Sequence, residues 1–247
     1  TVASKTYTTT NSPTITAAQG VTISSTGASS TITTGTGAIS AATVRISSAS
    51  TITSAAPITS RGVVEISSSA GDTTVSGGVN AAGDISIVGG AVAVNAAQTT
   101  TNSRNITINP RTAYTGTGTL SSAGSLTISG GSTVAPGATI RAAGNITLSG
   151  TGLFTSAANT SIVSTSGNLN ITSSASNVYG TLETSAGGSG NITMNNGGKT
   201  LLQSATVRAL GSGSVSISAG PVGDHSVQVN GSTISSTSGS ITVSGTT

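Results

Sequence analysis

The chain has a single histidine, His225, which is the natural place to look for catalysis. It lies in the stretch "GDHSVQV", directly after Asp224 and before Ser226, so a base, an acid and a nucleophile stand together. Neighbouring residues on an extended segment point to opposite sides, and these three side chains therefore cannot contact one another as a catalytic triad requires. We predict that His225 is a residue of a surface loop.

Acidic residues are the second source of possible chemistry. The chain has five of them: Glu65, Asp72, Asp84, Glu183 and Asp224. Two carboxylates that act on one glycosidic bond must lie within about 10 Å of each other. Glu65, Asp72 and Asp84 could approach one another only across adjacent coils of a fold, and the contexts "GDTTV" and "GDISI" are typical of turns. A polysaccharide lyase or hydrolase is therefore kept only as an alternative to a non-enzymatic protein.

A calcium-binding nonapeptide array needs an aspartate in every copy of its repeat. Most copies of the repeat in this chain have no aspartate. The absence of cysteine also excludes thiolate metal sites and a disulfide scaffold. The sequence predicts no catalytic residues, no cofactor and no metal site.

Several threonines share one position relative to a recurring pair of apolar residues. They are Thr22, Thr107, Thr127, Thr147, Thr193 and Thr242. Aligned on a flat face, their hydroxyl and methyl groups would resemble the water-ordering surface of ice-binding proteins. Arg45 and Glu65 interrupt the row, and threonine is favoured on any exposed strand. Ice binding is an alternative function for this row.

Six asparagines stand in sequences that match glycosylation acceptors: Asn105, Asn145, Asn159, Asn170, Asn191 and Asn230. A chain so rich in Asn, Ser and Thr produces several such sequences by chance. We interpret them as unmodified ladder or surface asparagines.

The composition places the chain outside the ordinary enzymes. It has 247 residues, of which 34 are glycine, 5% are charged and 2% are aromatic. The formal charge of +3 comes from basic residues scattered singly, which does not favour a nucleic-acid partner. The chain has no run of about 18 apolar residues, so the sequence predicts no membrane span. The first residues, "TVASKTYTTT", have no apolar signal core, so we expect a mature or excised segment.

A short repeat explains this composition. The hexamers "GNITLS" and "GNITMN" share a skeleton of two apolar residues around a polar one, and the skeleton recurs every 20 to 26 residues. Its copies are Val21/Ile23, Val44/Ile46, Val64/Ile66, Ile85/Ile87, Ile106/Ile108, Leu126/Ile128, Ile146/Leu148, Leu169/Ile171, Ile192/Met194, Val215/Ile217 and Ile241/Val243. Period-two alternation predicts a short strand at each copy.

Two further apolar positions flank most copies, which makes about three short strands per repeat. The upstream set is Ile39, Ile58, Val79, Leu120, Ile140, Val163 and Leu210. The downstream set is Ile32, Ile52, Val75, Val92, Val134, Phe154, Val178 and Leu201.

Strands of this length are unstable alone, and no helical pattern is present to cover a sheet. Stacking the repeats as coils solves the problem, because each strand then pairs in parallel with its copy one coil away. We predict an all-β, right-handed parallel β-helix of about eleven coils over residues 20–247, a rod roughly 50 Å long, after an N-terminal extension or end-pairing segment, 1–19.

Two details fix the predicted register. Small polar residues precede the apolar pairs and can form a ladder at one corner: Asp84, Asn105, Ser125, Asn145, Asn168, Asn191, Ser214 and Ser240. Between the paired residues of adjacent copies stand Arg45 and Glu65, which stacking would bring together as an exposed ion pair.

The phrases "ATIRAAGNITLSG", "GTLSSAGSLTISGG", "VNAAGDISIVGG" and "TVRALGSGSVSISAG" resemble the degenerate repeats of filamentous haemagglutinin, found in the passengers of two-partner secretion adhesins. The similarity runs over about residues 20 to 245. It implies a secreted bacterial surface or extracellular fibre protein that serves adhesion, aggregation or a biofilm matrix. Host or matrix glycans and proteins are its implied partners, and the secretion domain of the family has no counterpart in residues 1–20.

Both ends of the chain carry strand-like sequences, "TITA" and "GSITVSGTT". End coils of a solenoid present unpaired backbone groups to other chains. We therefore expect the last coil of one molecule to pair with the first coil of the next in a head-to-tail homopolymer.

Overall fold

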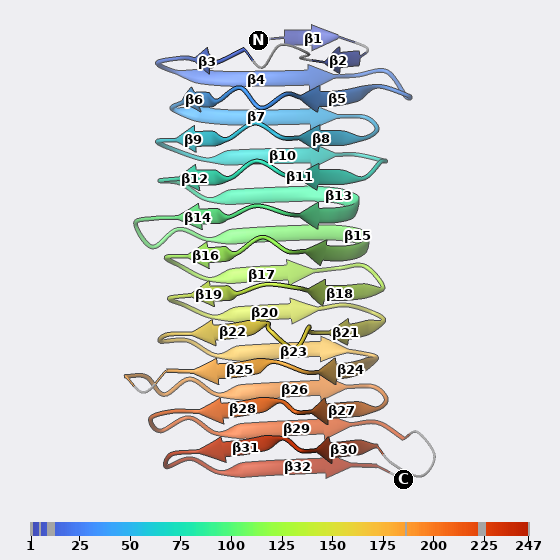
Figure 1. The fold of residues 1–247 in the computed structure, drawn as a ribbon, viewed down its shortest axis with the longest axis vertical. Helices are drawn as coiled ribbons and strands as arrows, with labels where there is room; N and C mark the ends of the chain where they lie inside the picture. Colours follow the sequence, from blue (N-terminus) through green and yellow to red (C-terminus); the bar gives the residue numbers. More distant parts are fainter. Residues whose placement is uncertain (1, 5, 9–12, 186, 222–225, 247) are drawn as a thin grey trace.

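The computed structural model describes residues 2–4, 6–8, 13–185, 187–221 and 226–246. Over this part the chain forms strands and no helix, and thus no helix that could cross a membrane. The strands stack in successive coils along one axis, with the N-terminus at one end of the rod and the C-terminus at the other (Figure 1). Each coil has three sides, which are called here the first, second and third side.

Strands on the three sides recur in a fixed order. The first side holds β1 (Val2–Ser4), β4 (Gly20–Ser25), β7 (Thr43–Ser48), β10 (Val64–Ser68), β13 (Ile85–Val94), β15 (Ile106–Gly116), β17 (Leu126–Ser129), β20 (Ile146–Ser149), β23 (Leu169–Ser173), β26 (Ile192–Asn196), β29 (Val215–Ala219) and β32 (Ile241–Gly245). The second side holds the later parts of β13 and β15, together with β2 (Thr6–Thr8), β5 (Thr31–Thr34), β8 (Ile52–Ser54), β11 (Thr73–Val75), β18 (Thr133–Pro136), β21 (Leu153–Thr155), β24 (Ala175–Val178), β27 (Thr200–Gln203) and β30 (Val227–Asn230).

The third side is a separate eleven-stranded sheet. It consists of β3 (Ile15–Thr16), β6 (Ile39–Ala41), β9 (Ile58–Ser60), β12 (Val79–Ala81), β14 (Gln98–Thr100), β16 (Leu120–Ser122), β19 (Ile140–Ala142), β22 (Ser161–Ser164), β25 (Thr181–Thr184), β28 (Thr206–Ala209) and β31 (Thr233–Ser236).

Parallel pairing between neighbouring coils confirms the predicted solenoid. Val21 pairs with Val44 and Val44 with Val64, and the same register continues copy by copy until Val215 pairs with Ile241. Ten such steps link the eleven predicted copies, at about 22 residues per turn. Coils of different length keep this register because the additional residues are placed in the turns, where no partner strand is displaced.

Residues 1–19, which the sequence analysis set apart, also carry paired strands. Val2 pairs with Ile23 and Tyr7 with Ile32, while Ile15 pairs with Ile39. The described part of this segment therefore forms one more rung in register with the coil that follows.

The predicted apolar pairs face the interior. Ile46, Ile66, Ile87 and Ile108 follow one another at the same position and are fully buried. Such columns hold β-branched and leucine side chains because every inward position touches its copies in the coils on either side. Tyr114 lies in the same core, and burial raises the pKa of its hydroxyl well above the usual value for tyrosine.

Three of the flanking apolar residues are not the ones that continue the interior columns. Ile162, not Val163, continues the column of Ile140. Val163 is the register partner of the outward Arg141, although only 9% of Val163 is exposed. In the same way Leu202 is buried and Leu201 is not. Two adjacent apolar residues fit either frame of a period-two pattern, and only the pairing register decides between them.

Leu210 is the third case. Val207 pairs with Leu182 and is fully buried, whereas Leu210 follows the end of β28. The repeat is longer here, and the inward residue, Val207, stands three residues before Leu210.

The predicted ladder is confirmed at the corner that precedes the first side. The Oδ1 atom of Asp84 accepts the backbone N–H of Asn105 at 2.8 Å, and Asn105 Oδ1 in turn accepts that of Ser125 at 2.8 Å. The same contact repeats through each successive coil to Ser214, whose Oγ accepts the N–H of Ser240 at 3.1 Å. Each side chain thus satisfies a backbone donor one coil away that strand pairing leaves unused.

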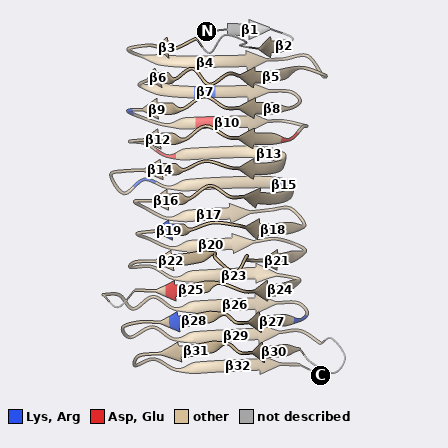
Figure 2. Ribbon diagram, viewed as in Figure 1, with Lys and Arg blue, Asp and Glu red and all other residues tan. Residues whose placement is uncertain are grey.

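The predicted ion pair is also present. Arg45 and Glu65 stand side by side in the register, with 3.3 Å between Arg45 Nη1 and Glu65 Oε2. A second pair, Glu183 with Arg208, occupies outward neighbours on the third side and was missed. Its two residues lie in adjacent coils, like those of the first pair. Their spacing of 25 residues, about one repeat, could have indicated the pair from the sequence. Among the described residues, charged side chains are otherwise scattered singly over the rod (Figure 2).

Substitution of one repeat at two adjacent positions tests the inward register. Ile146 is fully buried and Thr147, its neighbour on β20, faces outward. Ile146→Asp places a carboxylate without a partner in the column and is expected to cost about 3–5 kcal/mol of unfolding free energy. Thr147→Asp is expected to change it by less than about 0.5 kcal/mol. Denaturant unfolding measures both values, and equal tolerance at the two positions would contradict the register.

Candidate binding groove

Two of the candidate acids, Glu65 and Asp84, lie close together in the described part of the chain. Glu65 and Asp84 line one shallow depression together with Ser86, Asn105 and Thr107. Glu65 is engaged with Arg45, and Asp84 holds the Asn105 N–H in the corner ladder. Both carboxylates therefore have structural partners, and the arrangement leaves no free base beside a free acid.

The other acids are dispersed. Asp72 lies at a different corner, where its Oδ1 accepts the N–H of Ala91 at 2.7 Å, and Glu183 lies on the third side. Within the described residues no three histidines, cysteines or acids come together in a way that could hold a metal ion. His225 and Asp224 lie outside the described residues.

The predicted threonine row exists as one register on the first side, but it is short. Thr107, Thr127 and Thr147 follow one another on β15, β17 and β20. Asn170 ends this run in one direction, and Ser86 followed by Glu65 and Arg45 ends it in the other. A second set was missed on the second side, where Thr8, Thr33, Thr53 and Thr74 are consecutive register partners.

Three of the possible acceptor asparagines are members of the corner ladder. All three are exposed, and the Oδ1 atom of each accepts a backbone N–H of the next coil: Asn105, Asn145 and Asn191. This confirms the interpretation of these residues as ladder asparagines.

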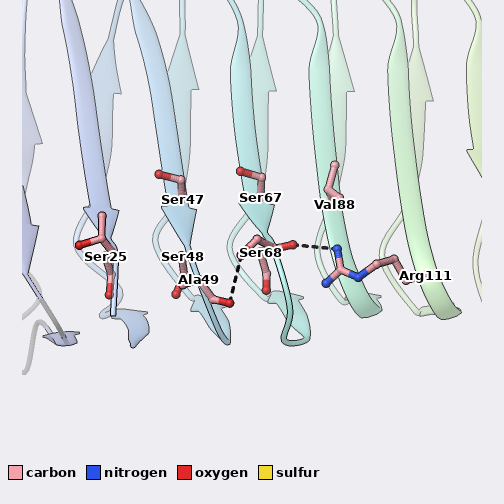
Figure 3. A pocket seen from close by; sticks show the side chains of 10 residues that line it. Ser25, Ser47, Ser48, Ala49, Ser67, Ser68, Val88 and Arg111 are labelled. Atoms are coloured by element: carbon pink, nitrogen blue, oxygen red, sulfur yellow. Dashed lines mark hydrogen bonds between the residues drawn. The ribbon is translucent and has the colours of Figure 1, made fainter. Parts of the chain in front are cut away.

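A groove of about 440 Å³ lies at the corner between the first and second sides. It crosses successive coils and is lined by Ser25, Thr26, Ser47, Ser48, Ala49, Ser67, Ser68, Ser69, Val88 and Arg111. We call it the serine groove. In Figure 3, Ser47, Ser67 and Val88 occupy the same place on three neighbouring strands, and Arg111 reaches toward Ser68 from a later coil.

Arg111 forms one end of the serine groove. Its Nη1 donates to the carbonyl oxygen of Ser68 at 2.9 Å, and its Nη2 donates to that of Gly71 at 3.2 Å. Arg111 belongs to β15 and Ser68 to β10, so the side chain passes over the intervening strand β13.

Glycines of β13 make room for this contact. The register between β13 and β15 is irregular from Gly89 to Ala91. A Cβ atom at Gly89 would approach the Thr73 hydroxyl to 2.7 Å, and one at Gly90 would approach Asp72 Oδ1 to 2.6 Å. The backbone at this corner is therefore packed too closely for any residue larger than glycine at 89 and 90. Neither position has a side chain that would obstruct Arg111 where it crosses β13.

The hydroxyl groups of the groove fall into two kinds. Ser48 and Ser68 are buried and donate to backbone carbonyls of the turn, Ser48 to Ser30 at 2.8 Å and Ser68 to Gly71 at 2.7 Å. Ser47 and Ser67 are outward partners one coil apart, and in the described part of the chain their hydroxyls make no hydrogen bond. These two groups are free to bind a ligand.

The serine groove was not predicted from the sequence, although part of it has a signal there. The triplet Ile-Ser-Ser occurs at 23–25, 46–48 and 66–68 on the first side, each time with the isoleucine inward, and once more at 234–236 on the third side. On the coils that hold 46–48 and 66–68, this gives one serine with a free hydroxyl and one buried serine. The contact of Arg111 has no such signal, because it spans 43 residues and depends on the shape of an intervening corner.

Comparison with known proteins yields one match. Residues 87–150 match the model of the family described as haemagglutinin repeat. The match covers β15, β17 and β20 and confirms the sequence-based resemblance to filamentous haemagglutinin-like repeat proteins. That family consists of non-enzymatic adhesins found outside cells or on their surface. No curated protein and no solved structure matches the chain.

Proposed function

We propose that this chain is the shaft of an extracellular fibre that serves adhesion, aggregation or a biofilm matrix, without catalysis. The observation that carries the proposal is the haemagglutinin repeat within a solenoid. A rod of stacked coils separates its two ends by many strands, which suits a spacer between a cell and a surface. The four candidate acids that the structure describes are engaged in the ladder, in ion pairs or in a turn.

The finer part of the proposal is that copies stack end to end. Strand β32 pairs with β29, and no other described strand covers its second edge. Its residues Ile241 and Val243 are 47% and 44% exposed, whereas their column neighbours Val215 and Ile217 are buried. An edge with free backbone groups above an open apolar column favours the addition of another coil. We propose that this coil belongs to a second copy of the chain.

Electron microscopy of the 247-residue protein at neutral pH tests the stacking. The first side holds twelve strands, counted from β1 to β32. At about 4.8 Å per strand the expected axial repeat of a filament is therefore about 58 Å. This exceeds the value of roughly 50 Å expected from eleven repeats, since β1 adds a rung. Isolated rods at high protein concentration would contradict the stacking.

Two variants of β32 make the test specific. Val243→Asp puts a charge on the inward column at the open edge, where it is expected to abolish filaments while the rest of the rod stays folded. Thr242→Asp, its outward neighbour, is the matched control and is expected to leave filaments intact. Filaments that form equally well with Val243→Asp would place the contact elsewhere.

The threonines of the second side support a second candidate function, ice binding. Thr31 and Thr33 on β5 are followed one coil later by Thr51 and Thr53, with Ile32 and Ile52 buried between them. Strand spacing repeats these hydroxyl and methyl groups every 4.8 Å or so across a sheet face. An ice-growth assay tests this candidate. Shaped ice crystals that disappear with Thr33→Lys and Thr53→Lys would support it, and unmodified crystal growth with the unaltered chain would reject it.

A further inference from the structure

The serine groove combines a cation with free hydroxyl groups on a surface that is otherwise poor in charge. We propose that it binds an acidic saccharide, with the carboxylate of a hexuronate unit on Arg111 and the sugar hydroxyls on Ser47 and Ser67. This inference rests on the proposed extracellular function, because the chain would encounter polymers of uronic acids outside the cell.

Arg111 keeps its positive charge available. Its two hydrogen bonds within the protein go to neutral carbonyl oxygens. Among the described residues no carboxylate lies within ion-pair distance of it, in contrast to Arg45 and Arg208. A guanidinium has five N–H donors, so three remain for a ligand, and their planar arrangement matches a carboxylate.

Ser47 and Ser67 provide the polar wall of the site. Their hydroxyls are free, they can each donate and accept, and they stand one coil apart at about 4.8 Å. Val88 continues the same row on the next coil and presents an apolar surface to the C–H face of a sugar ring. The row therefore offers two hydroxyls and an apolar contact in line. The guanidinium of Arg111 reaches back from β15 to the carbonyl of Ser68, the residue after Ser67.

The size and direction of the groove fit an oligosaccharide. Its volume of about 440 Å³ lies in the range of small-ligand sites, about 300–1,000 Å³. Because its lining residues come from successive coils, the groove can follow several units of a polymer. Neutral sugars lack the group that Arg111 would bind, which makes the acidic class the expected ligand.

Titration of the isotope-labelled 247-residue chain, followed by NMR amide shifts, tests the proposal. The probes are a hyaluronan octasaccharide, an oligogalacturonate of the same length and, as the neutral control, maltooctaose. We expect saturable shifts at Ser47, Ser67 and Val88 with at least one uronate probe and none with maltooctaose. Binding should weaken as salt is added, because the contact with Arg111 is screened. Which uronate probe binds distinguishes an animal matrix from a plant wall as the source.

Two serine variants locate the site without disturbing the contacts of Arg111, and a third variant tests the guanidinium itself. Ser67→Asp adds a repelling charge and is expected to raise the Kd at least tenfold. Ser149→Asp alters the same outward row several coils away and is expected to leave the Kd unchanged. Arg111→Lys keeps the charge but loses the planar fork, and several-fold weaker binding is expected.

Three results would overturn the proposal: no saturable shift with either uronate probe, equal binding of maltooctaose, or an unchanged Kd for Ser67→Asp. None of them bears on filament formation, which electron microscopy reports separately. A fibre that forms normally and binds no uronate would thus reject the saccharide site and leave the proposed shaft standing.

Discussion

Parallel backbone pairing between successive coils is the constraint on which the rest of this structure depends. Most strands have only three to six residues, too few to be stable alone. Each becomes stable because its N–H and C=O groups meet those of its copies in the neighbouring coils. A residue inserted within a strand would shift the later side chains of that strand to the opposite face. Length variation is therefore confined to the turns, and apolar columns run through the rod.

The corner ladder and the ion pairs extend this constraint to side chains. Asn145 and Asn168 each fix the backbone of the next coil through one amide oxygen. Arg45 with Glu65 and Glu183 with Arg208 use charge between adjacent coils, where exposed pairs contribute about 0–1 kcal/mol each. Such contacts are individually weak. Their effect comes from repetition at one offset, which favours a single register over any shifted one.

The same repetition explains which features could be predicted from sequence. A pair such as Ile146/Leu148 and a ladder residue such as Asn145 recur at a nearly constant offset, so the stacking and its corner follow from spacing alone. The inward residue was misidentified where two apolar residues stand side by side, as at Ile162 and Val163. It was also misidentified at Val207, which lies in a longer coil. The serine groove could not be predicted, because it depends on an arginine that reaches two coils across a glycine corner.

The coils on either side of the matched repeats keep the same architecture. The family match ends at residue 150, yet the first side continues in register from β20 to β32 without interruption. A protein built in this way can vary its outward residues freely as long as the inward columns persist. A local site such as the serine groove can then be placed on a shaft without altering the fold.

Cysteine pairs offer the most direct test of coil-to-coil pairing, because the chain has no cysteine of its own. Thr107 and Thr127 are outward register partners in adjacent coils, and Thr147 lies one coil further. Cα atoms about 4.8 Å apart can form a disulfide, whereas those of two coils, at about 9.6 Å, cannot. Mild oxidation at low protein concentration should thus join the pair Thr107→Cys and Thr127→Cys within one chain. The pair Thr107→Cys and Thr147→Cys should stay reduced, and the opposite result would contradict the solenoid register.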